Sequence, residues 1–123
     1  MKRVKDGIYY KVFQVWGKGL EGPHSQNTQL QKAGDVLRVV GKLKACRNGI
    51  HAIASRKIAD IDVWLSFNVF KRGSQQLWKV RLTTVYAVSS KVIARQCEML
   101  SQIKPRSPEG RRILRSAQNN GYY

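Results

Sequence analysis

The segment LWKVRLTTVYAV, residues 77–88, constrains the fold of this chain more than any other stretch. Its residues alternate between an apolar or β-branched set and a polar set, which are Trp78, Val80, Leu82 and Thr84 on one side and Lys79, Arg81 and Thr83 on the other. A period of two residues is typical of a β-strand with one face in a core and one in water. The pattern therefore predicts a sheet with a cationic outer face.

Two other segments near the N-terminus are predicted to extend this sheet. The residues IYYKVFQVW, 8–16, are dense in aromatic and β-branched side chains and predict a strand buried on much of both faces. A second extended stretch covers residues 36–45 and contains a turn or bulge at Gly41 and Lys42. Residues 17–35 between them are rich in glycine and amides, which is the composition of a loop.

The middle of the chain combines a turn signal with a helix signal. The dipeptide Asn48-Gly49 is favoured in tight hairpins, because both positions tolerate positive φ, and it predicts a hairpin that joins 43–46 to 50–54. Ser55 then caps a predicted short helix whose apolar residues recur at helical spacing up to Leu65. Residues 89–103 fit a helix or a strand by pattern alone.

The C-terminal segment carries a complete helix start. Lys104-Pro105 ends the preceding element, Ser107 is placed as the cap, Pro108 as the first helical residue, and Glu109 lies in the first turn. We therefore expect one α+β domain, mostly antiparallel sheet with one or two short helices, over residues 1–103. A basic C-terminal helix or arm is expected over residues 104–123.

Charge is the most unusual property of the composition. Twenty-three Lys and Arg against seven Asp and Glu give a formal net charge of +16. Between Val63 and Cys97 there are bases but no carboxylate, and these bases are Lys71, Arg72, Lys79, Arg81, Lys91 and Arg95. A charge of this size opposes compaction by self-repulsion unless a polyanion relieves it, so a phosphate-bearing partner is expected.

Cysteine and histidine usage argues against metal binding and secretion. Cys46 and Cys97 are far apart, match no metal-ligand spacing together with His24 and His51, and are interpreted as reduced thiols. The N-terminus lacks a signal-length apolar run, and no stretch approaches the ~20 apolar residues of a membrane span. We expect a protein of the bacterial cytoplasm that binds no metal and no membrane.

Two residues are candidates for catalysis, although a structural interpretation is favoured for each. His51 is either a general base or a strand histidine whose ring bonds a backbone carbonyl. Cys46 is a nucleophile only if its thiol lies within hydrogen-bond reach of His51, and hairpin thiols are more commonly small core fillers. No phosphate-binding loop of the GxxxxGK[ST] type is present.

The cationic side chains are the preferred functional candidates. Phosphate contacts are predicted for Lys71, Arg72, Lys79, Arg81, Arg111, Arg112 and Arg115. Aromatic residues that could stack on bases are Tyr122 and Tyr123 at the C-terminus, with Tyr9, Tyr10 and Trp16 as alternatives that are more commonly core. About five phosphate contacts on duplex DNA predict a log affinity against log salt slope of roughly −4 to −5.

The phrases YYKVF, GKLKACRNGIHA, WKVRL and SSKVIAR resemble a family of short bacteriophage and prophage domains of unknown function. That family has a YKVF-type opening strand, a CxxGFHA-type phrase and a strand with a Lys-Val-x-Ala motif. The likeness covers roughly residues 8–103 and implies that Lys91 to Ile103 is extended. The chain departs from the family at Ile50, where an aromatic residue is usual, and in its basic C-terminal arm.

A fainter likeness concerns the ADP-ribosyltransferase fold, in which NAD lies in a cleft of a split sheet. Gly49, Ile50, His51 and Ala52 are similar to its Gly-aromatic-x-Ala/Ser motif, whereas Lys11 stands where such folds use His or Arg. This resemblance implies NAD as cofactor and a catalytic role for His51, Cys46 or Glu98.

The preferred hypothesis is a non-enzymatic phage-type protein that binds nucleic acid or a ribonucleoprotein through its phosphates. It would act as a host-directed or counter-defence factor. Two alternatives remain open, namely an ADP-ribosyltransferase-like enzyme and an inhibitor that binds an acidic surface of a host protein.

Overall fold

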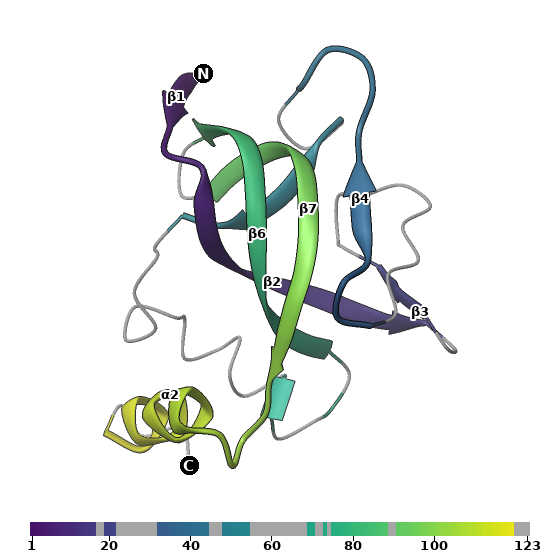
Figure 1. Ribbon diagram of the computed structural model, residues 1–123. Coiled ribbons are helices and arrows are strands. Elements are labelled where there is room, and N and C mark those ends of the chain that lie inside the picture. Colours follow the sequence, from purple (N-terminus) through teal and green to yellow (C-terminus); the bar gives the residue numbers. More distant parts are fainter. Residues whose placement is uncertain are drawn as a thin grey trace.

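The computed structural model describes residues 1–16, 19–21, 32–44, 48–54, 69–70, 73, 75–88 and 91–119 (Figure 1). Its strands are β1 Lys2–Val4, β2 Gly7–Trp16, β3 Gly19–Glu21, β4 Val36–Arg38, β5 Ile50–Ile53, β6 Gln75–Val88 and β7 Lys91–Ile103, and the described helix is α2 Pro108–Asn119. All these strands belong to one sheet, and every pairing in it is antiparallel. The long strands β6 and β7 form its centre.

The neighbours of these two central strands change partway along their length. β6 pairs with β2 up to Leu82 and with β1 from Val85 onward. β7 pairs with β5 over residues 91–94 and with β4 over residues 96–98. One set of flanking strands therefore replaces the other at the level where Thr84 and Arg95 lie.

Thr84 makes the bend at this level. Its φ is 58°, in the left-handed region that β-branched residues rarely adopt. Its backbone N–H donates a hydrogen bond of 3.0 Å to Oδ1 of Asp6, which lies where β1 gives way to β2. The bend also breaks the alternation of β6, because Leu82 and Val85 both point into the core. The prediction that Thr84 continues the inward set is therefore wrong.

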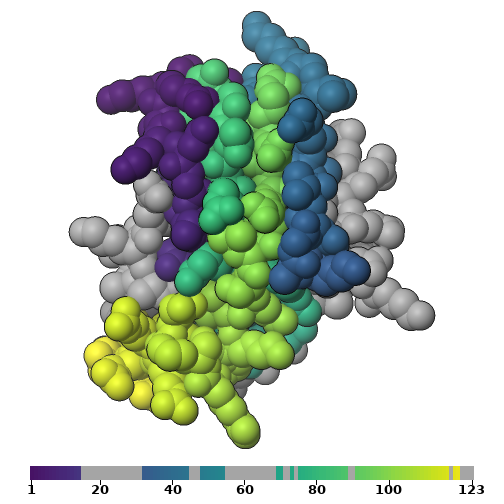
Figure 2. Space-filling model, in the orientation of Figure 1, coloured from purple at the N-terminus to yellow at the C-terminus, as the bar shows by residue number. Residues whose placement is uncertain are grey.

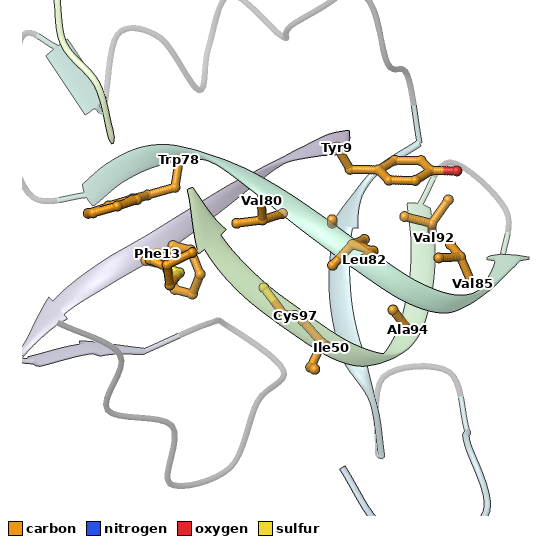
Figure 3. Packing of buried hydrophobic residues seen from close by; sticks show 12 residues of the cluster. Tyr9, Phe13, Ile50, Trp78, Val80, Leu82, Val85, Val92, Ala94 and Cys97 are labelled. Atoms are coloured by element: carbon orange, nitrogen blue, oxygen red, sulfur yellow. The ribbon is translucent and has the colours of Figure 1, made fainter. Parts of the chain in front are cut away.

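The main core lies between the folded-over halves of the sheet. Figure 3 shows side chains from β2, β5, β6 and β7 meeting there, among them Phe13, Ile50, Val80 and Cys97. These four are fully enclosed, and burial of apolar surface on this scale is the main stabilising term of such a domain. β5 also contacts β2, where Nζ of Lys11 donates a hydrogen bond to the carbonyl of His51.

A second, smaller core attaches α2 to the sheet. Ile113 is 3% exposed and packs with Tyr10, Leu77, Ile103 and Val69. Gly110 allows the helix to approach, because a Cβ there would stand 1.9 Å from the carbonyl oxygen of Lys104. The helix therefore lies on the end of the sheet at which β6 begins and β7 ends (Figure 1).

Several predictions from the sequence are confirmed. The fold is α+β and mostly antiparallel sheet, residues 77–88 lie within β6, and the ambiguous residues 89–103 contain the strand β7. Ser107 caps α2, because its Oγ accepts a 3.0 Å hydrogen bond from the N–H of Gly110. The predicted helix that begins at Ser55 lies outside the described residues.

Other predictions need correction. The stretch 17–35 was expected to be loop, but it contains β3, which pairs with the end of β2. Within its described residues 36–44, the stretch predicted to be extended contains strand only at β4. Asn48 and Gly49 are not the centre of a tight hairpin, because Asn48 already pairs with Lys44 through two backbone hydrogen bonds of 2.9 Å. Gly49 instead serves close packing, since a Cβ there would stand 2.3 Å from Ile93.

Candidate nucleic-acid interface

A cluster of exposed cations lies on α2 and on the turn that leads into it. We call it the arm surface, and its members are Lys104, Arg106, Arg111, Arg112 and Arg115. Among the described residues, no side chain of this group forms an ion pair or a hydrogen bond. Figure 2 shows α2 and this turn, in yellow and yellow-green, at the lower edge of the molecule.

The helix itself does not account for where these arginines lie. A helix dipole disfavours cations near the N-terminus and favours them in the last turn. Arg111 lies in the first turn of α2, and the last turn contains no basic residue. The arginines also leave the packing to Ile113, which is 3% exposed and lies in the smaller core. Their positions are consistent with a role outside the folded chain.

The cations predicted on β6 are in a different state. Nζ of Lys79 lies 3.4 Å from Oε1 of Glu109, and Nη1 of Arg81 lies 3.2 Å from Oε1 of Glu98. We call these four residues the paired face. Lys79 is thereby placed beside the start of α2, so the structure brings it next to the arm surface. Each of these two cations forms an ion pair with a carboxylate that is distant in sequence.

The other predicted contact residues divide into two groups. Lys71, Arg72, Tyr122 and Tyr123 lie outside the described residues, as does the side chain of Trp16. Tyr9 and Tyr10 are in the core, at 2% and 8% exposure, and the hydroxyl of Tyr9 donates a 2.6 Å hydrogen bond to the carbonyl of Lys5. Neither of these two rings is available to stack on a base.

The candidates for catalysis are not assembled into a site by the described residues. His51 is buried on β5, while Glu98 lies on the outer face of the sheet, paired with Arg81. Cys46 lies outside the described residues. The motif residues Ile50, His51 and Ala52 are all buried, and Ile50 packs in the main core.

Lys11 is a buried cation that the sequence analysis did not identify as buried. Lys11 is 1% exposed, and its amine contacts the carbonyl of His51 and lies 5.1 Å from the centre of the Phe13 ring. Burial is the main reason that the pKa of Lys11 is lowered to about 8, with a smaller opposing effect from Cys97 and a further lowering contribution from the charge of Lys91. The signal was present in the alternation of Tyr9, Lys11 and Phe13, which places the lysine on the inward face of β2.

Cys97 is the titratable neighbour of Lys11 in this core. It is a free thiol with no exposed surface. Burial raises the pKa of Cys97 to about 12, against the opposing effect of Lys11. A thiol in this environment is protonated at neutral pH, so it acts as a core side chain and not as a nucleophile.

Within the described residues, no group of three or more His, Cys, Asp or Glu side chains is arranged to hold a metal ion. None of the helices in the same part of the chain has the length and apolar character needed to cross a membrane. No protein family, no curated protein and no solved structure matches the chain. The resemblance to bacteriophage and prophage domains therefore stays a prediction.

Proposed function

We propose that this protein binds nucleic acid through the phosphate backbone, without catalysing a reaction, and that the arm surface makes the principal contacts. The observation that carries the proposal is the state of Lys104, Arg106, Arg111, Arg112 and Arg115. They are exposed together on α2 and the turn that leads into it, and have no carboxylate partner among the described residues. The carboxylate nearest in sequence, Glu109, is already engaged by Lys79.

The chemistry of arginine supports a phosphate partner. A guanidinium group donates in a planar fork that fits two phosphate oxygens, and an exposed arginine loses little hydration when it binds. The net charge of +16 adds a long-range attraction that speeds association with a polyanion. The predicted likeness to phage domains supports a host-directed role for this binding.

The test compares two single substitutions that remove the same charge. Arg112→Gln removes a cation of the arm surface, and Arg81→Gln removes a cation of the paired face. We expect Arg112→Gln to weaken binding of a labelled 30-nucleotide RNA or 30-base-pair DNA about threefold to tenfold at low salt, and Arg81→Gln to weaken it less than twofold. The triple change of Arg111, Arg112 and Arg115 to Gln should lower the salt slope by about 2–3. Fluorescence anisotropy at several salt concentrations measures both quantities.

The same preparation separates this proposal from its alternatives. Nucleic acid that copurifies with the protein and is removed by ribonuclease or deoxyribonuclease supports it. Binding that ignores salt, or that requires an acidic host protein and no nucleic acid, contradicts it. Consumption of labelled NAD that is lost on His51→Ala would replace it with the enzyme hypothesis.

A further inference from the structure

The turn that follows β4 is held by side chains at every carbonyl. Nη1 of Arg95 donates to the carbonyls of Val39 and Gly41 at 3.0 and 2.9 Å. Nδ2 of Asn48 donates to the carbonyls of Val40 and Lys42 at 3.0 and 2.8 Å. Four successive carbonyls are thus engaged by two side chains from elsewhere in the sequence. We call residues 39–42, with Asn48 and Arg95, the stapled turn.

Both staples are themselves anchored in the sheet. Arg95 belongs to β7, and its carbonyl accepts a 2.8 Å hydrogen bond from the N–H of Val39. Asn48 pairs with Lys44 through its backbone immediately before β5. Gly41 supplies the positive φ of 86° that the turn requires. A turn held in this way loses little conformational entropy when it binds a ligand.

The surface that the stapled turn presents is suited to an anion. Val40 is 81% exposed, and Arg38, Lys42 and Lys44 around it are exposed. The N–H groups of Val40, Gly41 and Lys42 have no acceptor among the described residues. Because the carbonyls are engaged, their negative ends are compensated, and the guanidinium of Arg95 adds positive charge beside them. Free N–H groups of a turn are a common site for anions.

The local sequence contains no competing carboxylate. No Asp or Glu occurs between Asp35 and Asp60, and this stretch includes the whole stapled turn. Oδ2 of Asp35 accepts a hydrogen bond from the N–H of Lys32, at the opposite end of β4. Within this stretch of sequence, an anionic partner would therefore meet cations and N–H groups and no carboxylate.

We propose that the stapled turn is a second nucleic-acid contact, which binds a backbone phosphate. The N–H groups of the turn and the amines of Lys42 and Lys44 contact the phosphate, and Val40 packs against the adjoining sugar. This inference rests on the proposed function and adds a site to it. Lone basic loops attract phosphates through charge alone, whereas this turn also offers fixed donors and an apolar tip.

The position of the turn gives it a role that the arm surface cannot fill. The turn lies at the end of the molecule away from α2, as the blue and yellow segments show (Figures 1 and 2). A domain of this length is about 35 Å across, so one phosphate cannot touch both surfaces. The two surfaces therefore contact separate stretches of a long nucleic acid.

The experiment measures binding of the full chain to labelled 30-nucleotide RNA and 30-base-pair DNA by anisotropy. The double substitution Lys42→Gln and Lys44→Gln is matched by Lys2→Gln and Lys5→Gln, which remove two other exposed lysines. We expect the first pair to weaken binding about tenfold and to lower the salt slope by about 1–2, and the second pair to weaken it less than threefold.

A variant without charge change separates the built turn from simple attraction. Asn48→Ala removes one staple with its two hydrogen bonds and leaves the net charge at its original value. We expect it to weaken binding about threefold to tenfold with an unchanged salt slope, whereas Gln14→Ala, at another exposed amide, changes nothing. Circular dichroism and thermal unfolding of each variant establish that it is folded.

Val40→Ser, at a side chain with few contacts, is expected to weaken binding about twofold.

The outcomes separate this inference from the proposed function. If the two lysine pairs behave alike, the stapled turn is not a site, while a weakened triple arginine variant still supports the arm surface. Loss on Lys42→Gln and Lys44→Gln with an unaffected triple arginine variant supports the turn and contradicts the arm surface. Absence of binding to both nucleic acids overturns both ideas. Lysine-dependent binding to phosphatidylserine vesicles in place of nucleic acid overturns the turn as proposed.

Discussion

The paired face of β6 and the arm surface carry the same kinds of side chain in two different electrostatic states. On the paired face each cation is within 3.4 Å of a carboxylate that the fold brings to it. On the arm surface the cations are exposed and have no such partner among the described residues. The fold therefore decides which cations have a carboxylate partner. Whether a basic side chain is available to bind phosphate depends on its tertiary contacts more than on the number of basic residues in its segment.

The largest expected effect comes from separating the arm surface from the body. Gly110→Ala places a Cβ against the carbonyl of Lys104, a backbone atom that cannot turn away, so α2 must shift. We expect the free energy of unfolding to fall by about 2–3 kcal/mol. Nucleic-acid affinity should fall several-fold with little change in salt slope, because the charges remain but lose their fixed arrangement.

Denaturant unfolding and anisotropy measure these two quantities. Gln118→Ala, at an exposed position of the same helix, is the matched control and should change neither. If Gly110→Ala is as stable as the control, then the packing of α2 on the sheet is not what fixes the arm surface.

The core contains a cation in a third environment, which is neither paired with a described carboxylate nor exposed to water. Lys11 is buried, and its pKa of about 8 is well below the 10.5 of a free lysine. The charged form is therefore disfavoured by roughly 3 kcal/mol at neutral pH. Lys11→Met removes this penalty together with the bond to the His51 carbonyl.

We expect Lys11→Met to raise the free energy of unfolding by about 2 kcal/mol at pH 7. Denaturant unfolding is the measurement, and Lys2→Met at an exposed site is the control, with a change below about 0.5 kcal/mol. A loss of stability in Lys11→Met would mean that the contacts of the amine with His51 and Phe13 outweigh its desolvation.

The same two buried groups predict a dependence of stability on pH. Between pH 8 and 10.5 the unfolded chain holds a proton on Lys11 that the folded chain has released, so stability rises with pH. Cys97 acts in the opposite direction above pH 9.0, because its pKa of about 12 keeps the folded thiol protonated after the unfolded thiol has ionised. We expect a rise of about 0.5–1 kcal/mol from pH 8 to 9, a plateau to about 10.5, and a fall beyond it.

Unfolding curves measured at each pH for the unchanged protein, Lys11→Met and Cys97→Ala separate the contributions of Lys11 and Cys97. Lys11→Met should lose the rise, and Cys97→Ala should lose the plateau and continue to rise to about pH 10.5. Each variant is compared with its own value at pH 7, so a cavity left by Cys97→Ala does not enter the comparison. An unchanged profile in Lys11→Met would contradict burial of the charged amine.

Local features of this fold could be predicted from the sequence because their causes are local. The alternation around Trp78 and Val80 reports which face of β6 meets the core, and Ser107 three residues before Gly110 is a cap by its own spacing. The exposure of Arg111, Arg112 and Arg115 followed from the same local reasoning, whereas Lys104 and Arg106 were not among the predicted contact residues.

Features that depend on distant residues could not be predicted in the same way. The bend at Thr84 is completed by Asp6, which lies 78 residues away in sequence. The pairing of Arg81 with Glu98 requires the register of β6 on β7, and a shift of one residue would separate them. The stapled turn depends on Arg95 and Asn48, neither of which carries a signal for that role.

The substitution with the smallest expected effect tests the comparison between the two surfaces most directly, because it removes the carboxylate partner of a paired cation. Glu98→Gln removes the partner of Arg81 and leaves the guanidinium in place. An exposed ion pair contributes only about 0.2–1 kcal/mol, so stability changes little. If cation availability governs binding, affinity for the same RNA and DNA rises about twofold to threefold. Gln14→Lys, which raises the net charge equally at an exposed amide, gives a smaller rise. Equal increases in the two variants would show that net charge alone sets the affinity. The presence or absence of a carboxylate partner beside a cation would then have no effect on binding.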